Sequence, residues 1–400
     1  MKVKANSLLY SIFISIIIGL LLSGIIYFST IYKQLNIFYN NFEKMIIANQ
    51  SAINYSLKNI GNTDSLSLNN LDFNNKSTRT NFGLFDVLQV STISNQDTLN
   101  SYNIIGTKTK TKTALYLSNF SKELSYFGNV TLKGDLFLPN KYINTVYVNG
   151  VNNNLTRAEN AEISEIQLPV LSEKFSNSFR ILKSYITNNS KELNDLKFNS
   201  FSDKAKVINW QNKKFNCKGN IILFSKDSIV LTKQDRLEDI IVFSPIVKIE
   251  DGFEGNLQIY STKKISIGKN VFLKYPSSLL LYNEQNDTFD YKIFIDERSK
   301  IYGSILMFGG DIEKIDKNSI EIKKKSILLG DIYCQGKLSL QSNVYGSVYT
   351  YKFFLNENQT VYQNTLGNVK IDPTKLPNYF CKPQLFNQEN STYDFIKKVY

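Results

Sequence analysis

The chain has 400 residues, of which 42% are hydrophobic and 13% aromatic, and its formal net charge is +12 at pH 7. It contains no histidine, which excludes Ser-His-Asp and Cys-His catalysis, histidine proton shuttles and metal sites built on imidazole. The positive charge is scattered and almost all of it is lysine, which does not favour bidentate readout of bases or phosphates, so we predict no nucleic-acid partner.

The N-terminal residues predict a membrane-spanning helix. No charged residue occurs between Ala5 and Tyr32, and residues 8–32 form an apolar run. As a helix this run is about 37 Å long, against roughly 30 Å of hydrocarbon in a bilayer. A cleaved signal peptide is the alternative, but its apolar region is usually only about 7–15 residues long. Lys2 and Lys4 precede the run, so we expect residues 1–7 to be a cytoplasmic stub and the chain after residue 32 to lie outside the inner membrane.

Residues 33–61 predict an amphipathic helical stalk that continues the membrane helix. Apolar residues recur at spacings of three, four and seven, which is typical of one helix face, and Gly61 supplies a C-terminal stop. We therefore expect a single helix over about residues 6–60. The residues of this face are Leu35, Phe38, Phe42, Met45, Ile46, Ala52, Ile53 and Leu57.

This arrangement resembles the N-terminal helix of type IV pilin-like proteins. The segment KANSLLYSIFISIII is similar to the start of minor pseudopilins, with a basic residue, small residues and then an aliphatic run. It departs from them at Ala5, where pilins have glycine before the cleavage point, and at Tyr10, where most have glutamate. The resemblance implies lateral packing of the helix against other subunits in the bilayer.

Composition divides the rest of the chain into four regions. Residues 62–149 predict an N-terminal β region, of which residues 62–110 are rich in Asn, Ser and Thr. Residues 150–210 are partly helical in pattern and predict an insertion or link. Short apolar runs follow one another through residues 211–380, which predict the main β domain, and residues 381–400 form a C-terminal tail.

One short motif, Gly-[Asn/Asp/Ser]-[Ile/Leu/Val], recurs six times. Glycine permits a positive φ at a sharp corner, and the aliphatic residue after it is expected to point inward and stack on its equivalent in the next coil. We therefore predict a mainly β protein whose outer region is a single-stranded parallel β-helix, or solenoid. The motif is not evenly spaced, so an antiparallel β-sandwich with Gly-rich turns is the alternative fold. The predicted corner glycines are Gly134, Gly219, Gly255, Gly303, Gly330 and Gly346.

Two further resemblances accompany this motif. The segment SILLGDIYCQGKLSLQSNVYGSVYTYKF (326–353) resembles the β-helix of bactofilins in its rhythm of apolar residues around glycine. Residues 104–139 resemble a segment of uncharacterised single-pass envelope proteins of Bacteroidota, because ALYLS, FGNVTLKG and LFLP occur in the same order. These resemblances imply a β-helix and a cell-envelope location, and no established activity.

The sequence contains few groups that could perform chemistry. The cysteines Cys217, Cys334 and Cys381 show no CxxC spacing, and we expect Cys217 and Cys334 to be buried thiols, with one disulfide left open as an alternative. Glycoside hydrolysis needs two carboxylates facing one cleft. The candidates are Asp296, Glu297 and Arg298 in one segment and Asp311, Glu313 and Asp316 in another, and solvated turns are the simpler interpretation of both. Glu250, Asp251 and Glu254 lack the alternating-oxygen pattern of a calcium loop, so we predict no metal and no cofactor.

The sequence as a whole predicts a non-enzymatic structural or adhesive protein of the cell envelope. It would be single-pass in the inner membrane, with a cytoplasmic N-terminus and a periplasmic or extracellular C-terminal domain. The predicted partners are the lipid bilayer, other envelope or pilus-like assembly proteins that contact the N-terminal helix, and an anionic glycan. The alternative is a membrane-anchored polysaccharide lyase or hydrolase built on the β-helix.

Overall fold

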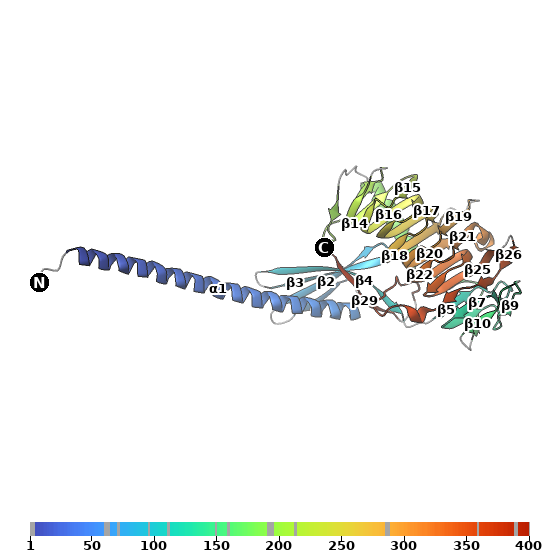
Figure 1. Cartoon of the computed structure of the whole chain (residues 1–400), viewed down its shortest axis with the longest axis horizontal. Coiled ribbons are helices and arrows are strands. Elements are labelled where there is room, and N and C mark those ends of the chain that lie inside the picture. The colour runs from blue at the N-terminus through green and yellow to red at the C-terminus, as the bar shows by residue number, and fades with distance from the viewer. Residues whose placement is uncertain are drawn as a thin grey trace. The chain divides into compact units, whose positions relative to one another are not determined.

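The protein is mainly β, with one long N-terminal helix (Figure 1). The computed structural model describes residues 5–59, 65–69, 73–94, 97–109, 113–148, 150–157, 161–189, 196–211, 214–284, 289–357, 360–387 and 391–399. The chain forms two compact units, one of Met1–Thr78 and Val90–Ser101 and the other of Arg79–Gln89 and Tyr102–Tyr400.

Helix α1 (Ala5–Asn59) is continuous, which confirms the single helix expected over residues 6–60. The stop expected at Gly61 lies outside the described residues. The predicted apolar face of the stalk is buried only in its C-terminal part: Met45, Ala52, Ile53 and Leu57 are buried. The face is exposed before that point, at Leu35, Phe38 and Phe42, and again at Ile46. Asn49 Nδ2 donates hydrogen bonds to Val90 O (3.2 Å) and Thr92 Oγ1 (3.0 Å), which ties the buried part of α1 to a strand of the same unit.

One sheet, which we call the five-stranded sheet, contains the first and the last strand of the described chain. It is ordered β1-β2-β3-β4-β29, and both of its outer strands, β1 and β29, pair antiparallel with their neighbours. Residues 381–400, predicted as a tail, therefore contain a regular strand. The strands are β1 (Ser65–Asn69), β2 (Asn74–Phe82), β3 (Phe85–Ile93), β4 (Thr98–Thr109) and β29 (Ser391–Val399).

In the described part of the chain the larger sheet has 21 strands, and it lies in the second unit. Its strands are β5 (Thr113–Leu117), β7 (Asn129–Leu132), β8 (Asp135–Leu138), β10 (Asn154–Arg157), β11 (Ala161–Ile163), β12 (Phe198–Asn199), β13 (Lys206–Asn209), β14 (Asn216–Phe224), β15 (Ser228–Leu231), β16 (Arg236–Ile249), β17 (Glu254–Ile267), β18 (Phe272–Asn283), β19 (Tyr291–Ile295), β20 (Lys300–Gly309), β21 (Asn318–Ile322), β22 (Ile327–Leu329), β23 (Ile332–Leu340), β24 (Asn343–Tyr345), β25 (Val348–Glu357), β26 (Thr360–Gln363) and β28 (Lys370–Ile371). Strands β6 (Ser125–Phe127), β9 (Asn144–Thr145) and β27 (Thr365–Gly367) form a small parallel sheet.

The larger sheet is built from repeated passes, where one pass is a stretch of chain that runs through the sheet once. Each pass pairs in parallel with the next one. Ile259 of β17 pairs with Leu279 of β18, Leu279 with Ile305 of β20, Ile305 with Ile332 of β23, and Ile332 with Val348 of β25. The pairing of β25 with β26 is antiparallel, and it forms a local hairpin. Because neighbours in the body of this sheet run parallel, the antiparallel sandwich that the sequence left open does not describe it.

The order of passes in the larger sheet differs from their order in the sequence. Val348 pairs with Leu115 of β5, Leu115 pairs with Leu136 of β8, and β8 pairs with β11. Figure 1 shows β5, β7 and β10, early in the chain, beside β25, which is late. The sheet therefore joins residues 113–163 to the region after residue 211, which the sequence-based division had separated.

Residues 164–189 and 196–205 belong to the part of the chain that returns across the outer face of this sheet. Tyr333 Oη of β23 donates a hydrogen bond to Pro169 O (3.0 Å), before helix α2 (Lys174–Asn189) begins. Phe179 of α2 packs against Tyr260 of β17, with ring centroids 5.0 Å apart. A helix of 16 residues spans about 24 Å, the width of roughly five strands. The region 150–210, predicted as a partly helical insertion or link, therefore contains strands β10 to β13 of the larger sheet as well as α2, which crosses the sheet between them.

Alternation of side chains along the strands separates two apolar clusters. The aliphatic residues that follow the six motif glycines are all fully buried in one inner cluster: Leu136, Ile221, Leu257, Ile305, Ile332 and Val348. Residues of the opposite strand face, including Tyr260, Leu306 and Tyr333, form the outer cluster together with Phe175 and Phe179 of α2. The crossing helix thus covers apolar strand faces that water would otherwise contact.

Four of the six motif glycines, Gly219, Gly303, Gly330 and Gly346, lie where a backbone carbonyl of another pass would contact their Cβ position. A Cβ atom at Gly330 would lie 2.1 Å from Gly303 O, and a Cβ at Gly346 would lie 1.9 Å from Gly330 O. Gly134, Gly219 and Gly330 have φ angles of 125°, 99° and 136°, which favour glycine. Gly255 and Gly346 do not have a positive φ. Glycine is needed at Gly346 because the carbonyl of Gly330 occupies its Cβ position, whereas the ring of Phe253 lies closest to the Cβ position of Gly255.

Two passes make the same corner without glycine, which explains the irregular spacing of the motif. Asp239 of β16 has φ 58° and lies at the strand irregularity opposite Gly219. Ser277 of β18 pairs with Gly303. The sequence between Gly219 and Gly303 therefore contains two passes that lack the glycine motif.

We expect Gly330→Ala to destabilise the protein far more than Gly252→Ala. Both glycines have positive φ angles, so both alanines incur about 1 kcal/mol of backbone strain. Only Gly330 has backbone against its Cβ position, and overpacking adds roughly 1–3 kcal/mol or more. Thermal and urea unfolding of both variants measure the difference, and equal destabilisation would show that contact between passes does not require glycine.

A buried ion pair fastens the segment before β29 to the larger sheet. Lys382 Nζ lies 3.0 Å and 2.8 Å from the two carboxylate oxygens of Asp331, and the side chains are 10% and 4% exposed. Ser347 N donates a further hydrogen bond to Asp331 Oδ1 (2.8 Å). The backbone of Lys382 also exchanges two hydrogen bonds of 2.8 Å with Thr107 of β4. These contacts hold β4 and the C-terminal segment together.

We expect Lys382→Met to lower the free energy of unfolding by about 3–5 kcal/mol, because Asp331 is left as a buried charge without its partner. Asp331→Asn combined with Lys382→Met removes both charges and should recover part of this loss. Chemical denaturation of Lys382→Met, of Asp331→Asn alone and of the double variant tests the pair. If the double variant is as unstable as the two single changes added together, the charges are not coupled.

Candidate functional site

The first candidate surface is the apolar helix α1. It is long and apolar enough to cross a membrane, and its most apolar stretch has none of its residues buried. Large hydrophobic side chains are exposed along it from Leu8 to Ile47. Side chains of this kind are stable in lipid or against another apolar surface, and unfavourable in water.

The two predicted carboxylate clusters lie at opposite ends of one strand row. Asp296, Glu297 and Arg298 follow the C-terminal end of β19, whereas Asp311, Glu313 and Asp316 precede β21. These two strands are five residues long and pair in parallel from Tyr291–Asn318 to Ile295–Ile322. The clusters are therefore roughly 16 Å apart at about 3.3 Å per residue, too far for a carboxylate pair of the glycosidase type to form between them.

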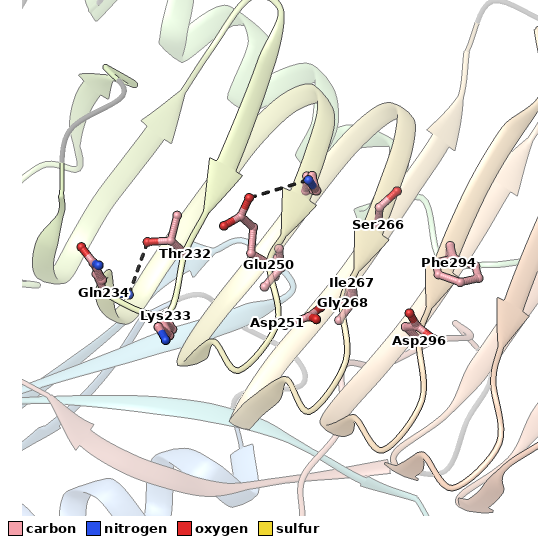
Figure 2. Close-up of a pocket in the computed structure, with 12 residues that line it drawn as sticks. Thr232, Lys233, Gln234, Glu250, Asp251, Ser266, Ile267, Gly268, Phe294 and Asp296 are labelled. Carbon is pink, nitrogen blue, oxygen red and sulfur yellow. Dashed lines mark hydrogen bonds and ion pairs between the residues drawn. The ribbon is translucent and has the colours of Figure 1, made fainter.

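One of these residues, Asp296, lines a shallow pocket of about 690 Å³ (Figure 2). Turns that follow neighbouring strands form its floor, with Gln234, Glu250, Asp251 and Gly268 among its lining residues. Lys248 pairs with Glu250 at 3.7 Å. Among the described residues, no three His, Cys, Asp or Glu side chains gather as they would around a metal ion. The pocket therefore presents side chains of both charges.

A row of lysines crosses the strand face beside this pocket. Lys264 of β17 pairs with Lys292 of β19, Lys292 with Ser319 of β21, Ser319 with Lys337 of β23, and Lys337 with Lys352 of β25. We call Lys264, Lys292, Lys337 and Lys352 the lysine row. The residue that follows each lysine along its strand is buried, so the row lies on the outward face.

Two carboxylates partly neutralise the lysine row. Glu321 contacts both Lys292 and Lys323 at 2.6 Å, and Asp316 lies 4.0 Å from Lys337 and 3.8 Å from Lys352. Partial burial would raise the pKa of Glu321, but the hydrogen bonds from the two lysines outweigh it and hold the pKa below its ordinary value. Glu321 is therefore a carboxylate at neutral pH, and it binds lysine rather than serving as an acid.

The cysteines are unsuited to nucleophilic chemistry. Cys217, Cys334 and Cys381 are buried and free, which confirms the burial expected for Cys217 and Cys334. Burial raises the pKa of Cys334 to about 12 and, with the charge of Asp235, that of Cys217 to about 11. Both thiols are therefore protonated at neutral pH and unreactive.

The lysine row has a sequence signal of its own, which is separate from the glycine motif. The four-residue segments KISI (264–267), KIFI (292–295), KLSL (337–340) and KFFL (352–355) share a lysine followed by apolar residues at the second and fourth positions. SIEI (319–322) has the same pattern with serine first. The segments are far apart in the chain, and only the parallel register brings them side by side.

Comparisons with known proteins identify no family. No protein-family model matches the chain, and no curated protein matches it. Among solved structures, the chain is similar to the competence-associated pilin ComZ from Thermus thermophilus, with a TM-score of 0.29 and 10% identity over 84% of this chain and 87% of that one. A similarity at this TM-score carries no conclusion about this protein. The resemblances to Bacteroidota envelope proteins and to bactofilins therefore stay predictions.

We expect Glu321→Gln to lower the free energy of unfolding by up to about 1 kcal/mol at neutral pH. Because the folded pKa of Glu321 is lowered, its stabilisation is present above the unfolded pKa and is lost as the pH falls through the folded pKa. The difference from the unaltered protein should therefore disappear in acid. Glu254→Gln is the control, since Glu254 is 60% exposed in its pair with Lys274 and should change stability less. Urea unfolding between neutral pH and pH 3 measures both, and a difference that persists at pH 3 would contradict the assignment.

Proposed function

We propose that this protein is a non-enzymatic, membrane-anchored structural component of a cell-envelope assembly. The observation that carries this proposal is the length of exposed apolar surface on α1. From Leu8 to Ile47 the helix measures roughly 60 Å at about 1.5 Å per residue, twice the roughly 30 Å of a bilayer core. Lipid can cover only about half of this surface.

The exposed apolar residues beyond the bilayer need another partner. With the N-terminus in the cytoplasm and the membrane span near residues 8–32, Leu35, Phe38 and Phe42 lie past the hydrocarbon. Their side chains are 47%, 51% and 41% exposed, and the rings of Phe38 and Phe42 stack on each other. Apolar residues at this spacing suit packing against a second helix, which is the lateral contact of a pilus-like or secretion-associated assembly.

We further propose that the larger sheet is a single-stranded β-helix that serves as a stiff outer scaffold. The support is the parallel pairing of successive passes and the continuous inner cluster of aliphatic residues. The wide separation of the two candidate carboxylate clusters gives no support to the alternative of a polysaccharide lyase or hydrolase.

Topology is tested by proteolysis of intact spheroplasts. We expect the region after residue 62 to be digested while a fragment containing the membrane span is retained. Protection of the C-terminal region until the membrane is broken would show that the orientation is wrong. Release of the intact chain from the membrane by alkali would show that α1 is not an anchor.

Helix packing is tested by cysteine cross-linking. Phe42→Cys lies on the exposed apolar face, whereas Asn40→Cys lies on the opposite side of α1. The native cysteines are buried, so we expect them to form no cross-links that would interfere with the measurement. We expect Phe42→Cys to form cross-links to another copy or another envelope protein in membranes, and Asn40→Cys to form few. Equal cross-linking at the two positions, or none at Phe42→Cys, would contradict a specific helix contact.

A further inference from the structure

The lysine row is unfavourable by itself, which calls for an explanation. Neighbouring strands of the sheet lie about 4.8 Å apart, and like charges on directly paired residues destabilise a sheet. Lys264 is paired with Lys292, and Lys337 with Lys352. No described carboxylate lies within ion-pair distance of Lys264, so the positive charge at that end of the row is not neutralised within the described part of the chain.

The carboxylates on this face are too few to neutralise it. Glu321 is shared by Lys292 and Lys323, and Asp316 is shared by Lys337 and Lys352. With Lys264, five lysines therefore face two carboxylates. The excess charge sits on one flat face of regular strands, where the lysines are held at fixed spacing rather than spread over mobile loops.

Aromatic rings hold the lysines in place and add flat apolar surface. Lys292 Nζ lies 5.2 Å from the ring centre of Phe294, and Lys337 Nζ lies 5.6 Å from that of Phe354. Both rings are half-buried. Such cation–π contacts order the ammonium groups, and the partly exposed rings offer a surface on which a sugar ring can stack.

The same face is hollowed and carries uncharged polar groups. A second pocket, of about 320 Å³, is lined by Lys292, Glu321, Lys337 and Phe354. The polar residues Ser319, Ser339, Gln341 and Asn356 also line it, and they can exchange hydrogen bonds with hydroxyl groups. The pocket that contains Asp296 borders it, because Phe294 lines that pocket and pairs with Glu321. The two hollows therefore adjoin along the lysine row.

We propose that the lysine row binds a linear acidic polysaccharide with a carboxylate on each sugar, laid across the strands. The ammonium groups would pair with the carboxylates, the serine and amide side chains with the hydroxyls, and Phe294 and Phe354 with the sugar faces. Lysine gives point-charge contacts and no bidentate fork, which suits carboxylates spaced along a chain better than phosphates or base edges. The site is independent of helix packing by α1, although an envelope location would expose it to such polymers.

Binding of polygalacturonate to the detergent-solubilised full chain tests this inference. Fully methyl-esterified polygalacturonate is the matched ligand, because it has the same backbone without charge. We expect the acid form to bind, binding to weaken as salt is added, and the ester to bind at least about tenfold more weakly. Equal binding of the two polymers, no binding of either, or tighter binding of single-stranded DNA would overturn the proposal.

Polygalacturonate binding by two double lysine variants tests whether the lysine row is the binding site. Lys292→Gln with Lys337→Gln should weaken binding at least about tenfold, because two of the five ammonium groups are lost. Lys141→Gln with Lys204→Gln removes the same charge from exposed positions outside the row and should leave affinity within about twofold. Thermal unfolding establishes that both variants are folded. Equal loss in the two variants would show that net charge alone, and not the lysine row, attracts the polymer. Since no membrane is needed, this result is separate from the outcome of the cross-linking and topology experiments.

Discussion

In-register parallel pairing of successive passes is the constraint on which this structure depends. Each position of one pass lies beside the same position of the next, so residues of one kind gather into rows. One inward row collects Ile259, Leu279, Ile305, Ile332 and Val348. At the corner the same constraint brings carbonyl groups against the next pass, where only glycine fits at Gly330 and Gly346. On the outward face it aligns lysines, at a cost in electrostatic repulsion.

The segment that contains α2 connects the two ends of the larger sheet. Because of this connection, early strands of the chain can extend the sheet beyond β25. Residues 113–163 stack beyond β25, and the chain must then return to the far end before building residues 206–357. An exposed outer strand face would otherwise contact water at Tyr260, Leu306 and Tyr333. The return segment covers that face with Phe175 and Phe179. The same connection therefore joins the two ends of the sheet and completes the outer apolar cluster.

The two surfaces proposed to act outside this core depend on opposite physical effects. The apolar face of α1 is driven away from water, and its extent beyond a bilayer favours contact with another helix. The lysine row depends on charges that stay hydrated, and it is held by carboxylates and aromatic rings on a rigid face. The two surfaces belong to different units, so neither proposal needs the other to hold.

The sequence by itself determined the features that arise from local pattern. The uncharged run before Lys33 and the helical spacing after it predicted α1, and the motif glycines predicted turning β structure with buried aliphatic residues. Tertiary structure alone decided the order of the passes, the lysine row and the position of the tail. Asp239 and Ser277 make corners without glycine, so the repeat cannot be counted from the sequence. The segments from KISI to KFFL are adjacent only through strand pairing, and Lys382 meets Asp331 only after the chain has wound. Such contacts join residues far apart in the chain. Their energies depend on the distances and burial that the folded structure creates, and a local sequence pattern does not contain this information.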